Sequence, residues 1–187
     1  LSNLMAVKPG EEVLIAIDPQ TDMRMANAMA AAALKCGAEY NISMMPIRGK
    51  DKATIFPKTL ESAMEVCDVF VGMTTASGAA IYNNRLKELI NEKKLREVSI
   101  CLRSIDNFTR GGALADYEEV YKDGEKLQKI WRGHKKAHIT TPAGTDLYME
   151  MNDMEPIIEC GIARNPGDAM AWSDGEVSLG PVIGSTR

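Results

Sequence analysis

The feature that most constrains the fold is a regular alternation of short apolar runs and helical patterns over the first 140 residues. The run from Glu12 to Ile17 is apolar and partly β-branched, and Asp18-Pro19 stops it, so it predicts a buried strand. The stretch from Asp22 to Lys35 is rich in Ala and Met, contains no Gly or Pro, and is followed by Gly37. This pattern predicts a helix with a cap at each end.

The strand-then-helix unit recurs along the chain. Further strands are expected at Tyr40–Met45, Asp68–Met73, Glu97–Leu102 and Ala137–Thr140, and further helices at Lys58–Val66, Ala79–Lys93 and Asp116–Trp131. Strands that alternate with helices pair in parallel through right-handed crossovers, with helices on both faces of the sheet. We therefore predict an α/β fold with a Rossmann-like, mostly parallel sheet flanked by helices.

The pattern changes after Thr141. Pro142 and Gly144 interrupt it, and the extended stretches that follow are short and joined by Gly, Pro, Asn and Asp. Such spacing is typical of β structure. We expect an N-terminal α/β domain over residues 1–140 and, over residues 141–187, the truncated start of a β-rich domain, since so short a segment cannot build a substantial core alone.

Charge and composition exclude several classes of protein. Lys and Arg number 22 against 26 Asp and Glu, which argues against nucleic acid as a partner. No apolar run approaches the roughly 18 residues that cross a bilayer, and the first residues lack the build of a signal peptide. We expect a cytoplasmic protein with no membrane partner, whose four widely spaced cysteines are buried free thiols: Cys36, Cys67, Cys101 and Cys160.

Polar residues follow three of the expected strands, where open parallel sheets bind ligands. These stretches are Asp18–Asp22, Thr74–Gly78 and Arg103–Asp106. The second has a physical case for binding an anion, because it leads into a helix N-terminus. An ordinary helix cap at Thr75 or Ser77 is the simpler interpretation. Neither GxGxxG nor GxxxxGK[ST] occurs, so the usual nucleotide motifs are missing.

The possible metal ligands are few. His134 and His138 lie four residues apart, but a strand is expected to begin between them, so we interpret them as exposed polar residues. Glu176 follows a Gly turn and opens an expected strand, so hydrogen bonding of the sheet would fix its carboxylate. From the residues alone, a solvated strand-edge position is the alternative.

Three stretches carry a resemblance to a known family: Thr140–Leu147 (TTPAGTDL), Arg110–Tyr117 (RGGALADY), and Gly175–Val177 followed by Gly180–Val182. Together they resemble the leucyl aminopeptidase (aminopeptidase T) family of metallopeptidases and the related 2,5-dihydroxypyridine 5,6-dioxygenases. The resemblance implies an N-terminal α/β domain followed by a catalytic domain that carries the metals, of which residues 141–187 would be the start.

The leading interpretation is a metal-dependent hydrolase of the aminopeptidase type, which removes N-terminal amino acids from peptides through two metal ions. The metals implied are zinc, cobalt or manganese, and the motif at Gly175–Val177 implies Glu176 as one ligand. The other ligands of the family fall on segments that this sequence does not contain, so no catalytic residue is assigned. The chain alone is expected to bind no metal and to be inactive.

Two alternatives stay open. One is a non-haem iron(II) dioxygenase that cleaves the ring of a small aromatic diol, with two His and a carboxylate as ligands. The other is a non-catalytic domain for small-molecule binding or dimerisation. In each case a homodimer is expected, because an incomplete β unit leaves strand edges unpaired.

Overall fold

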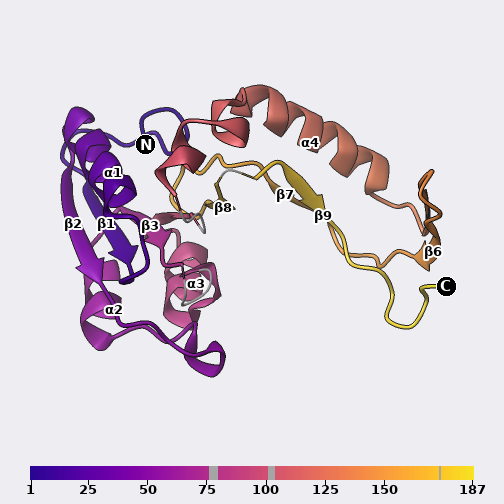
Figure 1. Ribbon diagram of the computed structural model, residues 1–187, viewed down its shortest axis with the longest axis horizontal. Helices are drawn as coiled ribbons and strands as arrows, with labels where there is room; N and C mark the ends of the chain where they lie inside the picture. Colours follow the sequence, from indigo (N-terminus) through magenta and orange to yellow (C-terminus); the bar gives the residue numbers. More distant parts are fainter. Residues whose placement is uncertain (76–79, 101–103, 173) are drawn as a thin grey trace. The chain divides into compact units, whose positions relative to one another are not determined.

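The computed structural model describes residues 1–75, 80–100, 104–172 and 174–187, which form two compact units (Figure 1). Unit 1 comprises Leu1–Tyr117 and Gly161–Asp174, and unit 2 comprises Glu118–Cys160 and Gly175–Arg187. The chain therefore leaves unit 1, builds most of unit 2, and returns. This division differs from the expected single boundary near residue 140.

Unit 1 is built on one parallel sheet of five strands in the order β2-β1-β3-β4-β8. The strands are β1 (Glu12–Ile17), β2 (Glu39–Met44), β3 (Val69–Met73), β4 (Arg96–Ser99) and β8 (Ala169–Ala171). The main helices of this unit are α1 (Met23–Lys35), α2 (Lys58–Met64) and α3 (Asn84–Asn91). The predicted α/β class with a mostly parallel sheet flanked by helices is confirmed.

Each face of this sheet buries its own apolar core. Alternate residues of β1, such as Val13 and Ile15, point to one face, where α1 contributes Met25 and Ala26. The residues between them, such as Leu14, point to the other face, which α2 and α3 cover. Period-two alternation of side chains thus explains why every β1 residue after Glu12 is buried.

A buried ion pair fixes the N-terminal segment against the sheet of unit 1. The Arg96 side chain, 3% exposed, pairs with Glu11 at 2.6 Å and donates through Nε to the backbone oxygen of Met5 at 2.6 Å. Its third partner is the backbone oxygen of Ala6, at 3.3 Å. The guanidinium satisfies its donors in this way, which is the condition for burying a charge.

The prediction that Ala137–Thr140 joins the parallel sheet is wrong, although these residues do form a strand. β5 (Lys136–Thr140) pairs antiparallel with β6 (Asp146–Glu150) in a two-stranded sheet of unit 2. The turn between them is closed by the bond from Thr141 N to Thr145 O at 3.0 Å, and Gly144 supplies a φ of +102°. The fifth place in the parallel sheet belongs to β8, whose three-residue sequence AMA carries no strand pattern.

Unit 2 also contains a helix packed on a short antiparallel ribbon. The helix is α4 (Tyr117–Trp131), whose first residue belongs to unit 1, and the ribbon pairs β7 (Ile157–Glu159) with β9 (Glu176–Ser178). A Cβ on Gly124 would lie 2.9 Å from Ile158 Cγ2 and 3.1 Å from Cys160 Sγ. Only glycine therefore allows α4 to approach the ribbon this closely.

Short 3₁₀ helices complete the description: η1 (Lys50–Lys52), η2 (Ala80–Tyr82), η3 (Ile105–Phe108) and η4 (Gly111–Leu114). The expected helix over Ala79–Lys93 is divided, because the Asn83 side chain caps a new helix start by accepting from Leu86 N at 2.9 Å. Ala79 lies outside the described residues. None of the helices in the described ranges is both long and apolar enough to span a membrane.

The cysteine prediction can be compared at three positions. Cys36, Cys67 and Cys160 are free thiols, and Cys67 and Cys160 are buried while Cys36 is half-buried. Burial raises the pKa of the Cys67 thiol to about 12, so this group is unreactive at neutral pH. Cys101 lies outside the described residues.

Candidate functional site

Several polar residues lie at the carboxyl end of the parallel sheet, where the strand order reverses. From β1 the chain goes to β2 on one side and then to β3 on the other, so the β1 and β3 ends adjoin at a topological switch point. Asp18 and Thr74, which follow these two strands, are both buried. Ligands of open parallel sheets bind at this position, so this polar edge of the sheet is the first candidate for a binding site.

Hydrogen bonds hold the two strand ends together. Thr75 Oγ1 donates to Asp18 Oδ1 at 3.0 Å, and Thr21 Oγ1 donates to the backbone oxygen of Met73 at 2.7 Å. Asp18 Oδ1 also accepts from Gln20 N at 2.8 Å. Thr75 is half-buried, whereas Asp18 and Thr21 are buried.

The third polar stretch also reaches this edge. Asp22 caps α1 by accepting from Arg24 N at 3.0 Å and also accepts from Ile105 N of η3 at 3.2 Å. The Arg24 side chain, bonded to Asp22, holds the pKa of that carboxyl well below its usual range. The structure thus brings together the described parts of all three predicted stretches. Residues 76–78, which include Ser77, and Arg103 lie outside the described residues.

Glu97 is a buried carboxyl that the sequence analysis did not single out. It lies on β4 with no exposed surface, and its Oε1 accepts from the Ser99 hydroxyl at 2.7 Å. Its Oε2 has no hydrogen-bond partner among the described residues. Burial raises the pKa of Glu97 to about 8 and outweighs the hydrogen bond from Ser99, which lowers it. Glu97 is therefore largely protonated and uncharged at pH 7.

The structure places Glu176, the predicted metal ligand, at the start of β9, directly opposite Glu159 of β7. Ile158 and Val177 point toward Gly124 of α4, so the two carboxylates lie on the other face of the ribbon. Glu176 is exposed and accepts a hydrogen bond from the Ser178 hydroxyl. Adjacent carboxylates suit a cation, but two acidic side chains do not complete a metal site.

The two histidines occupy a loop and a strand, as the sequence predicts. His134 is exposed in the loop before β5, and His138 is exposed on β5 itself. His138 Nε2 lies 2.6 Å from Asp146 Oδ1, and its ring stacks on Tyr148 with centroids 3.8 Å apart. These contacts fasten the β5–β6 hairpin across its two strands.

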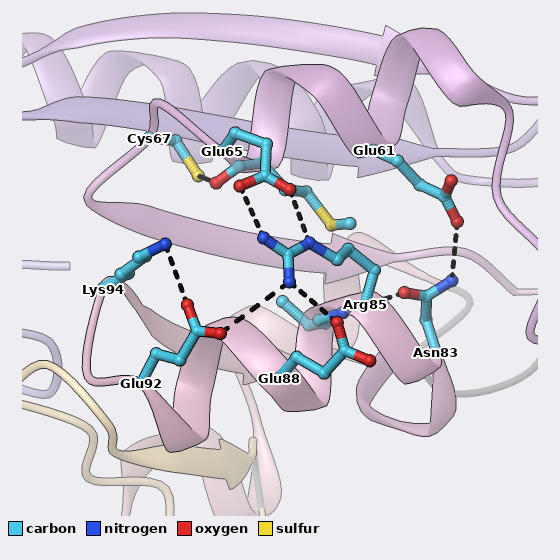
Figure 2. Close-up of polar contacts among 10 residues, drawn as sticks. Glu61, Glu65, Cys67, Asn83, Arg85, Glu88, Glu92 and Lys94 are labelled. Carbon is cyan, nitrogen blue, oxygen red and sulfur yellow. Dashed lines mark hydrogen bonds and ion pairs between the residues drawn. The ribbon is translucent and has the colours of Figure 1, made fainter.

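An ion-pair cluster joins α2 to α3 on the surface of unit 1 (Figure 2). Arg85 donates to both oxygens of Glu65, at 2.5 and 2.8 Å, and to Glu88 at 2.7 Å. Figure 2 shows Glu92 between Arg85 and Lys94, and its distances to these partners are 4.0 and 2.8 Å. Because the charges in this cluster are paired with one another, we assign it to the packing of α3 against α2.

The comparison with protein families decides which of the interpretations applies. A model of the NicX family, 2,5-dihydroxypyridine 5,6-dioxygenase, matches residues 2–187. The chain belongs to this dioxygenase family. The comparison with curated proteins gives no match.

A solved structure supports the fold of this dioxygenase family member. It is described as 2,5-dihydroxypyridine dioxygenase from Pseudomonas putida KT2440, and it matches with a TM-score of 0.76 at 17% sequence identity. The match covers 98% of this chain and 54% of the solved one. The chain thus spans about half the length of that structure.

The family match corrects the leading functional interpretation. The interpretation as a metal-dependent hydrolase, an aminopeptidase of the metallopeptidase class, is wrong, because the dioxygenase family is matched from residue 2 to residue 187. The part of the resemblance that concerned the related 2,5-dihydroxypyridine 5,6-dioxygenases is confirmed.

Dioxygenases of this family imply a metal cofactor, and the residues of this chain can be tested against it. Among the described residues, no three His, Cys, Asp or Glu side chains come close enough together to hold a metal ion. His138 is already engaged with Asp146, and Glu176 has only Glu159 opposite it. The described residues therefore do not fit a complete metal centre, and we derive no reaction step through one.

Proposed function

We propose that this chain is part of a dioxygenase that opens the ring of a dihydroxypyridine with molecular oxygen. The observation that carries the proposal is the family match over residues 2–187. Iron(II) is the proposed metal, because it can pass electrons to oxygen whereas zinc has no redox chemistry. Glu176 is kept as a proposed carboxylate ligand, to which other groups would have to be added.

The polar residues at the carboxyl ends of β1 and β3 suit a substrate of this chemical class. A dihydroxypyridine presents hydroxyl groups that both donate and accept hydrogen bonds. The half-buried Thr75 hydroxyl can meet such a group, while Asp18, completely buried, fixes the orientation of Thr75 through their 3.0 Å bond. We propose that Thr75 contacts the substrate and that Asp18 positions it.

The proposed activity can be tested with protein made from its complete gene and loaded with iron(II) without oxygen. On adding 2,5-dihydroxypyridine and oxygen, we expect one oxygen molecule to be consumed for each ring lost, measured with an oxygen electrode and by ring absorbance. No release of leucine from leucyl peptides is expected. Peptide hydrolysis without oxygen uptake would overturn the proposal.

Two substitutions test the assigned residues separately. Thr75→Val should raise KM for the dihydroxypyridine by roughly three- to tenfold, the value of one hydrogen bond, without changing iron affinity. Thr109→Val, on an exposed threonine, is its matched control. Glu176→Gln should weaken iron binding, whereas Glu150→Gln, on another exposed carboxylate, should not. Equal effects within either pair would remove the residue from its assigned role.

A further inference from the structure

The outer edge of β2 is an open edge of the parallel sheet of unit 1. β2 (Glu39–Met44) lies at one end of the five-stranded sheet and pairs with β1 on its inner side (Figure 1). No other strand in the part of the chain that the structure describes pairs with its outer side. An open edge presents unpaired backbone donors and acceptors, which favour pairing with another strand.

The pairing with β1 shows which backbone groups of β2 point outward. The N–H groups of Glu39 and Met45 both donate inward, to backbone oxygens on the β1 side, at 2.9 Å. Backbone groups of successive residues face opposite sides of a strand, so those of Tyr40, Ile42 and Met44 point outward. These three residues offer ladder hydrogen bonds to a further strand.

The side chains of the same three residues form an apolar row. They align with alternate residues of β1 that belong to the core beneath α1. Tyr40 is 40% exposed and Met44 is 57% exposed, with the half-buried Ile42 between them. Edge strands are commonly protected by a charge, a proline or a bulge. Residues 40–44 include neither a charge nor a proline, and their register with β1 is unbroken, so this edge lacks these protections.

A second copy of β2 fits this edge about a two-fold axis at Ile42. Antiparallel pairing then places Tyr40 opposite Met44 of the partner subunit and brings the two apolar rows together. In this register all three outward-facing residues exchange backbone hydrogen bonds with the partner strand. A two-fold axis at Asn41 or at Ser43 would leave one of the three without a partner within β2, so the axis at Ile42 is favoured.

The charge of β2 permits this self-pairing. Its one charged residue is Glu39, three positions from the axis, so the carboxylates of the two copies would lie about 20 Å apart along the ribbon. The screening length at physiological ionic strength is only about 8 Å, so their repulsion is weak.

We propose that unit 1 forms a homodimer by antiparallel pairing of β2 with β2 of a second copy, which joins two five-stranded sheets into one. The inference is independent of the proposed dioxygenase function. The sequence-based expectation of a homodimer concerned the incomplete β unit of residues 141–187, whereas this contact lies in unit 1.

Amide hydrogen exchange, measured by NMR over a range of protein concentrations, tests the pairing at each residue. The N–H groups of Tyr40, Ile42 and Met44 should exchange rapidly in dilute protein and at least about tenfold more slowly once the dimer forms. Those of Asn41 and Ser43, which face β1, should be protected at every concentration. Outward N–H groups whose exchange does not depend on concentration would overturn the proposal, as would new protection elsewhere with none at β2.

Paired substitutions test the register. Tyr40→Lys with Met44→Lys places like charges opposite each other and should raise the dimer Kd at least about tenfold by sedimentation velocity. Tyr40→Glu with Met44→Lys places opposite charges there and should give a Kd at least about threefold below that of the double-lysine variant. Tyr82→Lys with Leu114→Lys, at two exposed positions on η2 and η4, is the control for net charge and should leave the Kd within about twofold.

Equal Kd values for the two β2 variants would overturn the register. An equal loss in the control would show a general effect of charge and overturn the assignment to β2. An unmodified chain that stays monomeric at every concentration would overturn the dimer, and this result needs no variant.

Discussion

Replacing Glu97 with Gln should raise the free energy of unfolding at neutral and alkaline pH. Burial raises the pKa of Glu97 from 4.5 to about 8. Gln has nearly the same shape, keeps an oxygen to accept from the Ser99 hydroxyl, and cannot ionise. The variant therefore removes the charge that the folded protein disfavours.

The sign and size follow from the two pKa values. Below about pH 4.5 Glu97 is protonated in both states and has no effect, whereas between about pH 4.5 and pH 8 the unfolded chain releases a proton that the folded chain keeps. Stability therefore falls as pH rises through this window and is level above it. At about 1.4 kcal/mol per pKa unit, the loss is about 3 kcal/mol at pH 7 and about 5 kcal/mol in full.

Urea unfolding at several values between about pH 5 and pH 8 measures this effect. The stability difference between Glu97→Gln and wild type should grow by about 3 kcal/mol over that range, and taking the difference cancels the titration of every other group. Glu39→Gln, on the exposed edge strand β2, is the control and should show no such growth. A difference for Glu97→Gln that is the same at both ends of the range would refute the reasoning.

Four further predictions concern ion pairs, packing and association. Arg96→Met should destabilise the protein by about 3–5 kcal/mol, because it leaves the Glu11 charge and the backbone oxygens without their buried partner. Arg85→Ala, at the cluster of Figure 2, should destabilise the protein much less than Arg96→Met, and less still at high salt, because its charges are exposed to solvent; urea unfolding of both variants tests the contrast, which equal losses would contradict. Gly124→Ala should lower stability by about 1 kcal/mol or more, because the contact with Ile158 outweighs the gain in helix propensity, and a more stable variant in the same assay would contradict this. Sedimentation velocity should show a concentration-dependent dimer, as expected from the unpaired strand edges, and a single monomer boundary at all concentrations would argue against it.

The first half of the fold could be predicted because its elements are defined locally. The apolar runs at β1 and β3, and the helix that Asp22 caps, follow from residues adjacent in sequence. β8 could not be found in the same way. Its three residues become a strand only by pairing with β4, about 70 positions earlier, so the cause of its structure is remote in sequence.

The same difference between local and remote causes applies to the site residues. Asp18 and Thr75 could be picked out because parallel strands end at a common edge, whereas their 3.0 Å bond depends on the order of β1 and β3 in the sheet. Glu97 could not be recognised as a buried carboxyl from its position alone, because it begins an expected strand, and charged residues are common at strand ends. The available signal was its place in a strand expected to be buried on both faces, where a carboxyl has no water to face.

The late return of the chain to β8 has a consequence for protein synthesis. β4 leaves the ribosome about 70 residues before its neighbour β8, which at 5–20 residues per second leaves one strand edge open for roughly 4–14 s. Until β8 pairs with β4, Glu97 lies on an open edge where water can reach its carboxyl and the group can ionise, and a charged side chain on an open edge opposes pairing with other chains. Glu97 would then oppose aggregation of the nascent chain, although the same carboxyl lowers the stability of the folded protein. The more stable Glu97→Gln protein is accordingly expected to give a smaller soluble fraction per chain translated.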